Sequence, residues 1–232
     1  MTLSSSYVSV VIPAFQAEAF VDDAIRSVLD QDAPPGELVV VDDGSTDGTA
    51  ERLAAWGDRI AVVRQANHGL GRSRNVGVAA TSGRLLAFLD ADDLWLPDKL
   101  ARQVEHLEAH PDDLAVFGWM QNFVQPGSGI EPDPRTPLDP RPAYQAPTML
   151  ARREVMDVVG PFDEVGPMQG WTDWYLRLKE SGRSLGMVDA LVLRRRIHGA
   201  NMTMRAENVM GEYQRLIRAS LQRRRAQAAE GP

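Results

Sequence analysis

The first half of the sequence alternates between short apolar runs and segments in which apolar positions recur with helical spacing. The apolar runs are rich in β-branched residues, so they predict strands. They lie at residues 7–13, 37–41, 60–64 and 84–89, and helical patterns lie between them at 21–29, 49–56 and 70–80. Because strands of this kind are buried on both faces, the alternation predicts a mostly parallel sheet covered by helices, an α/β fold.

The second half follows a less regular pattern. A helix is predicted at residues 96–110, with Pro97 at its first position and one apolar face. Residues 125–147 are rich in Pro, Gly and Asp, which predicts a long irregular loop. Loops of this length are uncommon in compact domains, so we expect a flap that becomes ordered when a substrate binds. Further helices are expected at about 153–159, 171–180 and 207–226, and apolar stretches lie at 185–188 and 191–197.

The composition of the 232 residues is that of a soluble globular protein, with 44% hydrophobic and 25% charged residues. No apolar run approaches the roughly 18 residues of a membrane span, and the N-terminus lacks the basic segment of a signal peptide, so we expect a cytoplasmic protein. The absence of cysteine excludes disulfides, thiolate nucleophiles and cysteine-bound zinc. The net charge of -7 argues against a nucleic-acid partner, and an anionic ligand then needs a metal ion or a helix N-terminus.

Three acidic residues, Asp90, Asp92 and Asp93, directly follow the fourth predicted strand. Ligand sites of parallel sheets lie beyond the C-terminal ends of the strands, so this cluster should meet the polar segments that follow the first two strands. Asp90 and Asp92 can offer hard oxygen ligands to Mg²⁺ or Mn²⁺, and the ion can bridge a diphosphate. A solvated turn that caps the next helix fits the same residues, so the spacing alone leaves both interpretations open.

Four segments occur in a fixed order and carry a resemblance to a known family. They are VSVVIPAFQAEAFVDDAIRSVLDQ at 8–31, LVVVDDGSTDGT at 38–49, GLGRSRNVGVAATSGRLLAFLDADD at 69–93 and WLPDKLARQVEHL at 95–107. Together they closely resemble the family 2 glycosyltransferases with the GT-A fold, strongly over about residues 7–110 and more weakly to about residue 200. The resemblance implies a Rossmann-like, mostly parallel sheet flanked by helices. It also implies metal-assisted transfer of a sugar, with inversion, from a nucleoside-diphosphate sugar to an acceptor hydroxyl.

On the nucleotide side, the resemblance assigns Pro13 and Ala14 to the pocket of the base and Asp43 to a hydrogen bond with the base. A carboxylate suits a pyrimidine, because uracil and thymine carry an imide N–H donor. We therefore favour a UDP- or dTDP-sugar as the donor. The aromatic–Asn pair of the family reads Phe15 and Gln16 here, which leaves the exact base open.

Around the diphosphate, the resemblance assigns Asp92 to the metal, Mn²⁺ or Mg²⁺, and Asp90 to the metal or the ribose. His198 would complete the metal or diphosphate site, although a lone histidine also fits a hydrogen-bonded structural residue. Arg74 matches a basic residue near the nucleotide, and a salt bridge to a neighbouring carboxylate fits it equally well.

The catalytic base of the family is the Asp of an acidic pair that opens a helix, and Asp173 occupies this position behind Thr172. Such a base removes the proton of the acceptor hydroxyl during attack. An acid that only stabilises the start of a helix is the alternative. Asp173 also argues against a catalytically inactive nucleotide-sugar-binding module. A nucleotidyltransferase would bring a glycine-rich, basic first loop, which this sequence lacks.

The resemblance divides one GT-A domain into two parts. Residues 1–110 would bind the nucleotide sugar, and residues 111–232 would bind the acceptor and supply the base. The acceptor stays open among a glycan, a lipid-linked molecule and a small molecule, because fold-level analogy does not specify it.

The predicted C-terminal helix carries an apolar stripe that runs into a basic end. The stripe consists of Val209, Tyr213, Leu216, Ile217 and Leu221. Because it spans only a few turns, docking on the domain itself or on a second subunit of a homodimer is favoured over contact with an anionic membrane surface. Contact with the inner face of the membrane is the alternative, and it would suit a lipid-linked acceptor.

Overall fold

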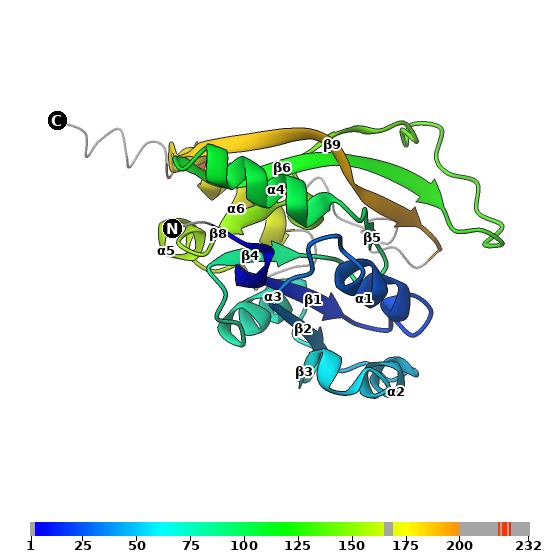
Figure 1. The fold of residues 1–232 in the computed structure, drawn as a ribbon. Helices are drawn as coiled ribbons and strands as arrows, with labels where there is room; N and C mark the ends of the chain where they lie inside the picture. The colour runs from blue at the N-terminus through cyan, green and yellow to red at the C-terminus, as the bar shows by residue number, and fades with distance from the viewer. Residues whose placement is uncertain (1–2, 165–168, 200–217, 219, 222, 224–232) are drawn as a thin grey trace.

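The computed structural model describes residues 3–164, 169–199 and positions 218, 220, 221 and 223. A nine-stranded sheet runs through the described part of the chain in the order β3-β2-β1-β4-β8-β6-β9-β5, and β7 pairs with β6 (Figure 1). The strands are β1 Val8–Ala14, β2 Glu37–Asp42, β3 Ala61–Arg64, β4 Leu85–Phe88, β5 Leu94–Trp95, β6 Asp113–Val124, β7 Arg141–Ala143, β8 Leu150–Arg152 and β9 Ser184–Ile197. The first four strands are parallel to their neighbours within that group, and β6 is parallel to β9. Most paired positions are therefore parallel, and the predicted α/β architecture is confirmed.

Helices cover both faces of this sheet. They are α1 Val21–Leu29, α2 Thr49–Ala54, α3 Leu70–Ala79, α4 Lys99–Ala109, α5 Val155–Val159 and α6 Gln169–Glu180, with 3₁₀ turns at Ser5–Tyr7, Gly57–Arg59 and Ala146–Thr148. Successive side chains of a strand point to opposite faces, so Val10 and Ile12 of β1 share a core with α1 and α4. Val11 instead shares a core with α5 and α6. Among the described helices, none is long and apolar enough to cross a membrane.

The second half departs from the sequence-based expectation in its strands. β6 lies where no strand is predicted, and the apolar stretches at 185–188 and 191–197 belong to the single strand β9. The two strands pair along most of their length, with irregular register in the middle. Pairing with β9 therefore determines that β6 forms a strand, more than the order of apolar and polar residues within β6 does. The expectation of an irregular loop over 125–147 is wrong at its end, because β7 and a 3₁₀ turn lie there. Only 125–140 keeps the irregular backbone of a flap.

Two helix boundaries also bear on the predictions. α4 begins after Asp98, which is its N-cap residue, so Pro97 precedes the helix instead of opening it. The helix predicted at 207–226 lies largely outside the described residues, and the four described positions of this segment are helical.

A carboxylate, Glu37, ties the starts of β1 and β2 to the turn before β4. It accepts hydrogen bonds from the Ser9 hydroxyl at 2.6 Å, from the Ser82 N–H at 2.9 Å and from the Ser82 hydroxyl. Burial opposes the ionisation of Glu37, but the hydrogen bonds from Ser82 and Ser9 outweigh it and lower its pKa from 4.5 to about 2. The ionised side chain therefore stabilises this corner of the sheet.

Glu37→Gln should lower the free energy of unfolding by about 1–3 kcal/mol near neutral pH, the size of a lost charge-assisted hydrogen bond. A lowered folded-state pKa adds stability above the unfolded value of 4.5, and this stability is lost as the pH falls through about 2. Chemical denaturation at a series of pH values should therefore show the gap between wild type and variant closing in this window. The exposed Glu51→Gln is the matched control, and a gap for Glu37→Gln that stays constant with pH would contradict the assignment.

Candidate functional site

The polar segments that follow β1 and β2 lie against each other. The backbone N–H of Asp43 donates to the carbonyl of Ala14 at 2.8 Å, and the N–H of Gln16 donates to the Ser45 hydroxyl at 3.0 Å. Gln16 is the one described non-glycine residue with a positive φ, 51°, so the chain turns sharply there. The structure thus brings Pro13 and Ala14, the predicted pocket residues, beside Asp43.

Asp43 is 4% exposed, and its carboxylate accepts three hydrogen bonds from the loop that leads into α3. The donors are Nε2 of Gln65 at 2.7 Å, the N–H of His68 at 2.9 Å and the N–H of Gly69 at 2.8 Å. Gly69 caps the N-terminus of α3, where a negative charge is favourable. Asp43 therefore holds the loop and the helix start in place, and it still has acceptor capacity on Oδ2, which takes one of the three bonds.

Arg74 on α3 reaches the acidic cluster that follows β4. Its side chain is 3% exposed, and its Nη2 donates to Oδ1 of Asp90 at 3.0 Å. The guanidinium also lies over the ring of Phe162, 5.7 Å from the centroid. Of the two roles that the sequence left open for Arg74, the structure shows the salt bridge to a neighbouring carboxylate. This bridge fixes the direction of Asp90, whose side chain is 35% exposed.

The end of β9 completes the cluster from the other side. Nε2 of His198 lies 2.9 Å from Oδ2 of Asp92, and the imidazole packs against Phe20 with 4.4 Å between the ring centroids. The backbone N–H of Arg196 donates to Oδ1 of Asp93 at 2.8 Å, and its Nε donates to the carbonyl of Asp92 at 2.9 Å. Asp92 and His198, predicted as metal ligands, therefore face each other.

The carboxylates of the acidic cluster repel one another. Burial raises the pKa of Asp93 well above the usual value of 3.8, and the charges of Asp92 and Asp90 add to this rise. Burial also raises the pKa of Asp90, against the lowering effect of Arg74. A bound cation would relieve this repulsion.

The donor atoms fit a hard divalent cation. Carboxylate oxygens and an imidazole nitrogen are suitable ligands for Mn²⁺, and Asp92 and His198 present one of each toward the other. Oδ1 of Asp90 is instead engaged by Arg74. Within the described residues, a group of three such ligand atoms that lie within 4.8 Å of one another occurs elsewhere, around the end of α4 and the start of β6. An ion at the acidic cluster would therefore depend on Asp92, His198 and oxygens of the substrate; Mg²⁺ sites likewise combine one or two carboxylates with substrate phosphates.

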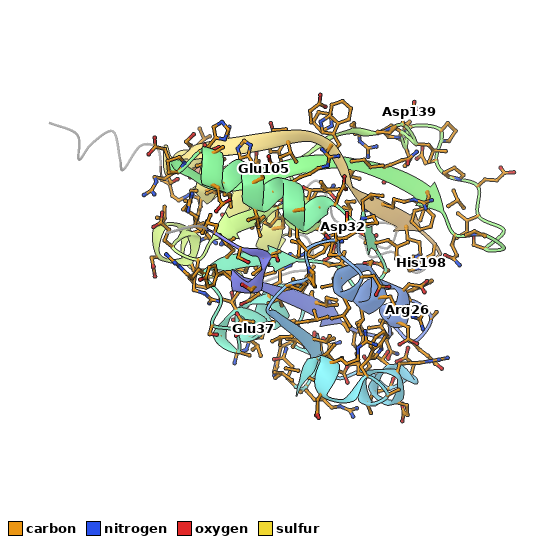
Figure 2. All side chains as sticks on the ribbon, viewed as in Figure 1. Arg26, Asp32, Glu37, Glu105, Asp139 and His198 are labelled. Atoms are coloured by element: carbon orange, nitrogen blue, oxygen red, sulfur yellow. The ribbon has the colours of Figure 1, made fainter. Side chains whose placement is uncertain are left out.

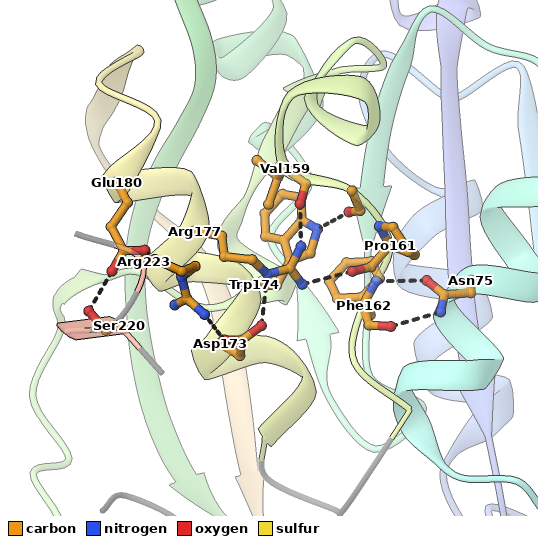
Figure 3. Close-up of polar contacts among 11 residues, drawn as sticks. Asn75, Val159, Pro161, Phe162, Asp173, Trp174, Arg177, Glu180, Ser220 and Arg223 are labelled. Carbon is orange, nitrogen blue, oxygen red and sulfur yellow. Dashed lines mark hydrogen bonds and ion pairs between the residues drawn. The ribbon is translucent and has the colours of Figure 1, made fainter. Parts of the chain in front are cut away.

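Asp173 on α6 lies in a network of ion pairs (Figure 3). Its Oδ2 accepts from Nε of Arg177 at 2.7 Å, and its Oδ1 accepts from Nη1 of Arg223 at 3.0 Å. Arg177 in turn donates to the carbonyls of Val159 and Pro161. The carboxylate thus links α6 to the C-terminal segment and to the turn after α5.

Two residues, Arg196 and Phe20, support the cluster. From the sequence, Arg194, Arg195 and Arg196 together are candidates for positive charge near a phosphate, and alternation along a strand lets only some of them point inward. Arg194 and Arg196 share the face that contacts Phe123, and of these two Arg196 is buried whereas Arg194 is exposed. For Phe20 the sequence carries no comparable signal, since its contact with His198 joins the start of α1 to the end of β9.

Comparison with known sequences identifies the family. Residues 9–162 match Glycosyl transferase family 2. An uncharacterised glycosyltransferase of Nostoc sp. is 30% identical over 239 residues, which cover 93% of this chain and 72% of the relative. TuaG of Bacillus subtilis, named as a teichuronic acid biosynthesis glycosyltransferase, is 41% identical over 111 residues, 46% of this chain and 44% of TuaG. The match to TuaG thus spans less than half of that protein.

Solved structures of glycosyltransferases share the fold. S. aureus TarS 1–349 in complex with UDP-GlcNAc gives a TM-score of 0.70 at 18% identity, covering 92% of this chain and 65% of that chain. The mannosyltransferase PcManGT from Pyrobaculum calidifontis, solved with GDP-Man and Mn²⁺, gives 0.66 at 19% identity, covering 91% and 64%. At these identities the likeness establishes the GT-A fold alone, whereas the family match extends over more than half of the sequence. The chain therefore belongs to Glycosyl transferase family 2.

Proposed function

We propose that this chain transfers a sugar from a nucleoside-diphosphate sugar to an acceptor hydroxyl, with inversion at the anomeric carbon and with the help of a divalent cation. The observation that carries the proposal is the facing pair of Asp92 and His198 at 2.9 Å, beside Asp90 and beyond the end of a parallel strand. In this proposal residues 1–110 bind the nucleotide sugar, and residues 111–232 supply His198, the base and the acceptor side.

The donor side rests on the contact between the ends of β1 and β2. Relatives of the same fold were solved with UDP-GlcNAc and with GDP-Man, which are both nucleoside-diphosphate sugars. Asp43, beside Pro13 and Ala14, keeps acceptor capacity on an oxygen that takes a single hydrogen bond. An imide N–H would satisfy it, so we favour a UDP- or dTDP-sugar.

The diphosphate side rests on the acidic cluster. When bound, Mn²⁺ or Mg²⁺ would supply positive charge that stabilises the departing diphosphate. Asp92 and His198 would hold the ion, while Phe20 and Arg196 keep these two groups in position. Asp90 is fixed by Arg74 through one oxygen, and its other oxygen can accept a hydrogen bond from a ribose hydroxyl.

The acceptor hydroxyl needs a base, and Asp173 is the residue that we propose. Each of its oxygens accepts a hydrogen bond from one arginine and keeps a second lone pair for a hydroxyl. Arg177 is fixed by the carbonyls of Val159 and Pro161. We therefore propose that the acceptor hydroxyl donates to Oδ1 of Asp173, the oxygen that is paired with Arg223.

The acceptor class is drawn from the relatives. TuaG is named for teichuronic acid biosynthesis, and it is 41% identical over 111 residues. This relationship supports a hydroxyl of a glycan as the acceptor. Transfer assays that compare glycan, lipid-linked and small-molecule acceptors would test this choice.

Asp92→Asn should weaken the Mn²⁺-dependent binding of a nucleoside diphosphate by at least about 10-fold to 100-fold, because even supporting groups of a metal site have effects of this size. Isothermal titration calorimetry with UDP, with and without Mn²⁺, measures the loss. Asp112→Asn, which alters an exposed carboxylate outside the cluster, should bind like the wild type. Unchanged Mn²⁺-dependent affinity in Asp92→Asn would refute the metal assignment.

Asp173→Asn should keep donor binding but lose transfer by about 10²-fold to 10⁴-fold, the usual contribution of a positioned base. Steady-state kinetics and calorimetry on the same variant separate the two effects. Proton NMR of the wild-type product should show the anomeric configuration opposite to that of the donor, as a single in-line displacement requires.

Arg223→Gln is the matched control, because it removes the Asp173–Arg223 ion pair while leaving the carboxylate. If Asp173 is the base, this variant retains transfer. If the carboxylate only holds the ion pairs, Asp173→Asn and Arg223→Gln lose stability and activity to a similar extent. That second outcome, or a product with retained configuration, would show that the base has been misassigned.

A further inference from the structure

A second cluster of metal-binding side chains lies at the far end of the β6–β9 pair. His106 and His110 stand four residues apart at the C-terminal end of α4, and their rings stack with 4.2 Å between centroids. Nε2 of His106 lies 2.8 Å from Oδ2 of Asp113, which opens β6. One ligand atom from each of the three residues lies within 4.8 Å of the others.

This His-His-Asp cluster is remote from the acidic cluster of the proposed active site. Ser184 opens β9 and donates to Asp113, whereas His198 follows the end of the same strand. A strand of 14 residues at about 3.3 Å per residue spans on the order of 40 Å. Figure 2 places Glu105, the residue before His106, and His198 in separate regions of the molecule. An ion at the His-His-Asp cluster would therefore not touch the donor site.

Hydrogen bonds already orient the ligand atoms of the cluster. Nδ1 of His110 lies 3.0 Å from the carbonyl of His106, an arrangement that fits a proton on Nδ1 and a bare Nε2. Oδ1 of Asp113 accepts from the Ser184 hydroxyl, which directs Oδ2 toward His106. Contacts of this kind support the ligands of metal sites by fixing the imidazole tautomer and the direction of the carboxylate.

The carboxylate of the cluster lies at the edge of the protein interior, against the two imidazoles. Its side chain is 10% exposed, and that of His106 is 16% exposed. A partly buried carboxylate next to two imidazoles is a donor set that transition metals prefer over Ca²⁺ or Mg²⁺.

These atoms pack against the backbone of a glycine, at a position where no side chain would fit. A Cβ at Gly186 would lie 2.0 Å from Nε2 of His106 and 2.7 Å from Oδ2 of Asp113. The cluster also borders a surface pocket of about 380 Å³, lined by both histidines and by Met187, Val188, Asp189 and Ala190. An ion therefore has a path to the ligand atoms from solvent.

We propose that His106, His110 and Asp113 bind Zn²⁺ or a similar transition-metal ion, with water as the fourth ligand. Tetrahedral zinc with bonds near 2.1 Å separates its ligands by about 3.4 Å, and the ligand atoms of this cluster all lie within 4.8 Å of one another. The ring of His110 is exposed, so it can move toward the ion when the ion binds. The bound ion joins α4 to β6, and through Ser184 to β9, so it stabilises the fold at this corner.

The test is calorimetric titration of the chelator-treated full chain with Zn²⁺, without nucleotide sugar, in a His198→Ala background that removes the imidazole of the acidic cluster. Adding His110→Ala should weaken Zn²⁺ binding by at least about 10-fold, because even the loss of a residue that only hydrogen-bonds to a metal ligand has an effect of this size. Zn²⁺ should also raise the Tm of the background protein by a few degrees and leave that of the His110→Ala protein unchanged.

His68→Ala in the same background is the matched control, because it removes a histidine outside the His-His-Asp cluster and should leave Zn²⁺ affinity unchanged. His110 is exposed, so its replacement should not unfold the chain. Equal Zn²⁺ affinities in the His110→Ala and His68→Ala proteins would overturn the proposal, as would the absence of both heat and Tm change in the background protein. Since the readout is metal binding alone, neither result bears on sugar transfer.

Discussion

The proposed active site depends on the polar contacts that the end of the long strand β9 makes with the aspartates of the acidic cluster. Asp93 is 3% exposed, and a buried carboxylate is costly unless it is paired. β9 supplies the partners: the N–H of Arg196 binds Asp93, its guanidinium binds the carbonyl of Asp92, and His198 faces the Asp92 carboxylate. The register of β9 against β6 therefore sets the positions of the predicted metal ligands, and a slip of one residue would turn these side chains to the other face.

A single helix, α3, connects this cluster to the other parts of the site. The backbone directly before it is held by Asp43 through the N–H groups of His68 and Gly69, and Arg74 in its middle pairs with the acidic cluster. Asn75 exchanges two hydrogen bonds of 2.9 Å with the backbone of Phe162, shortly before α6. Gly71 allows the close approach, because a Cβ there would lie 2.0 Å from the carbonyl oxygen of residue 163. These contacts therefore connect the proposed donor side of the site to the proposed acceptor side.

The sequence by itself determined the first half of the fold and the family. The strands β1 to β4 and the helices α1 to α3 form where the apolar periodicity predicts them, because each pattern is local and is reinforced by the next one along the chain. The four ordered segments carried the resemblance that the family match over 9–162 confirmed. The rule that parallel strands place their ligands at their C-terminal ends predicted that the segments after β1 and β2 and the acidic cluster after β4 converge; the bond between Gln16 and Ser45 joins the first two, and the convergence with the acidic cluster stays a prediction.

The tertiary structure alone decided the partners of the charged residues and the strands of the second half. β6 and the unbroken β9 exist because they pair with each other, and no local pattern encodes a pairing between segments about seventy residues apart. For Arg74 the sequence offered a nucleotide and a carboxylate equally, and the fold shows the carboxylate, because it places Asp90 at 3.0 Å. Asp173 gained two arginine partners, one of them 50 positions away in the C-terminal segment. The type of a residue determines which chemistry its side chain can perform. Which donors and acceptors lie close enough to interact is decided only when remote segments of the chain pack together.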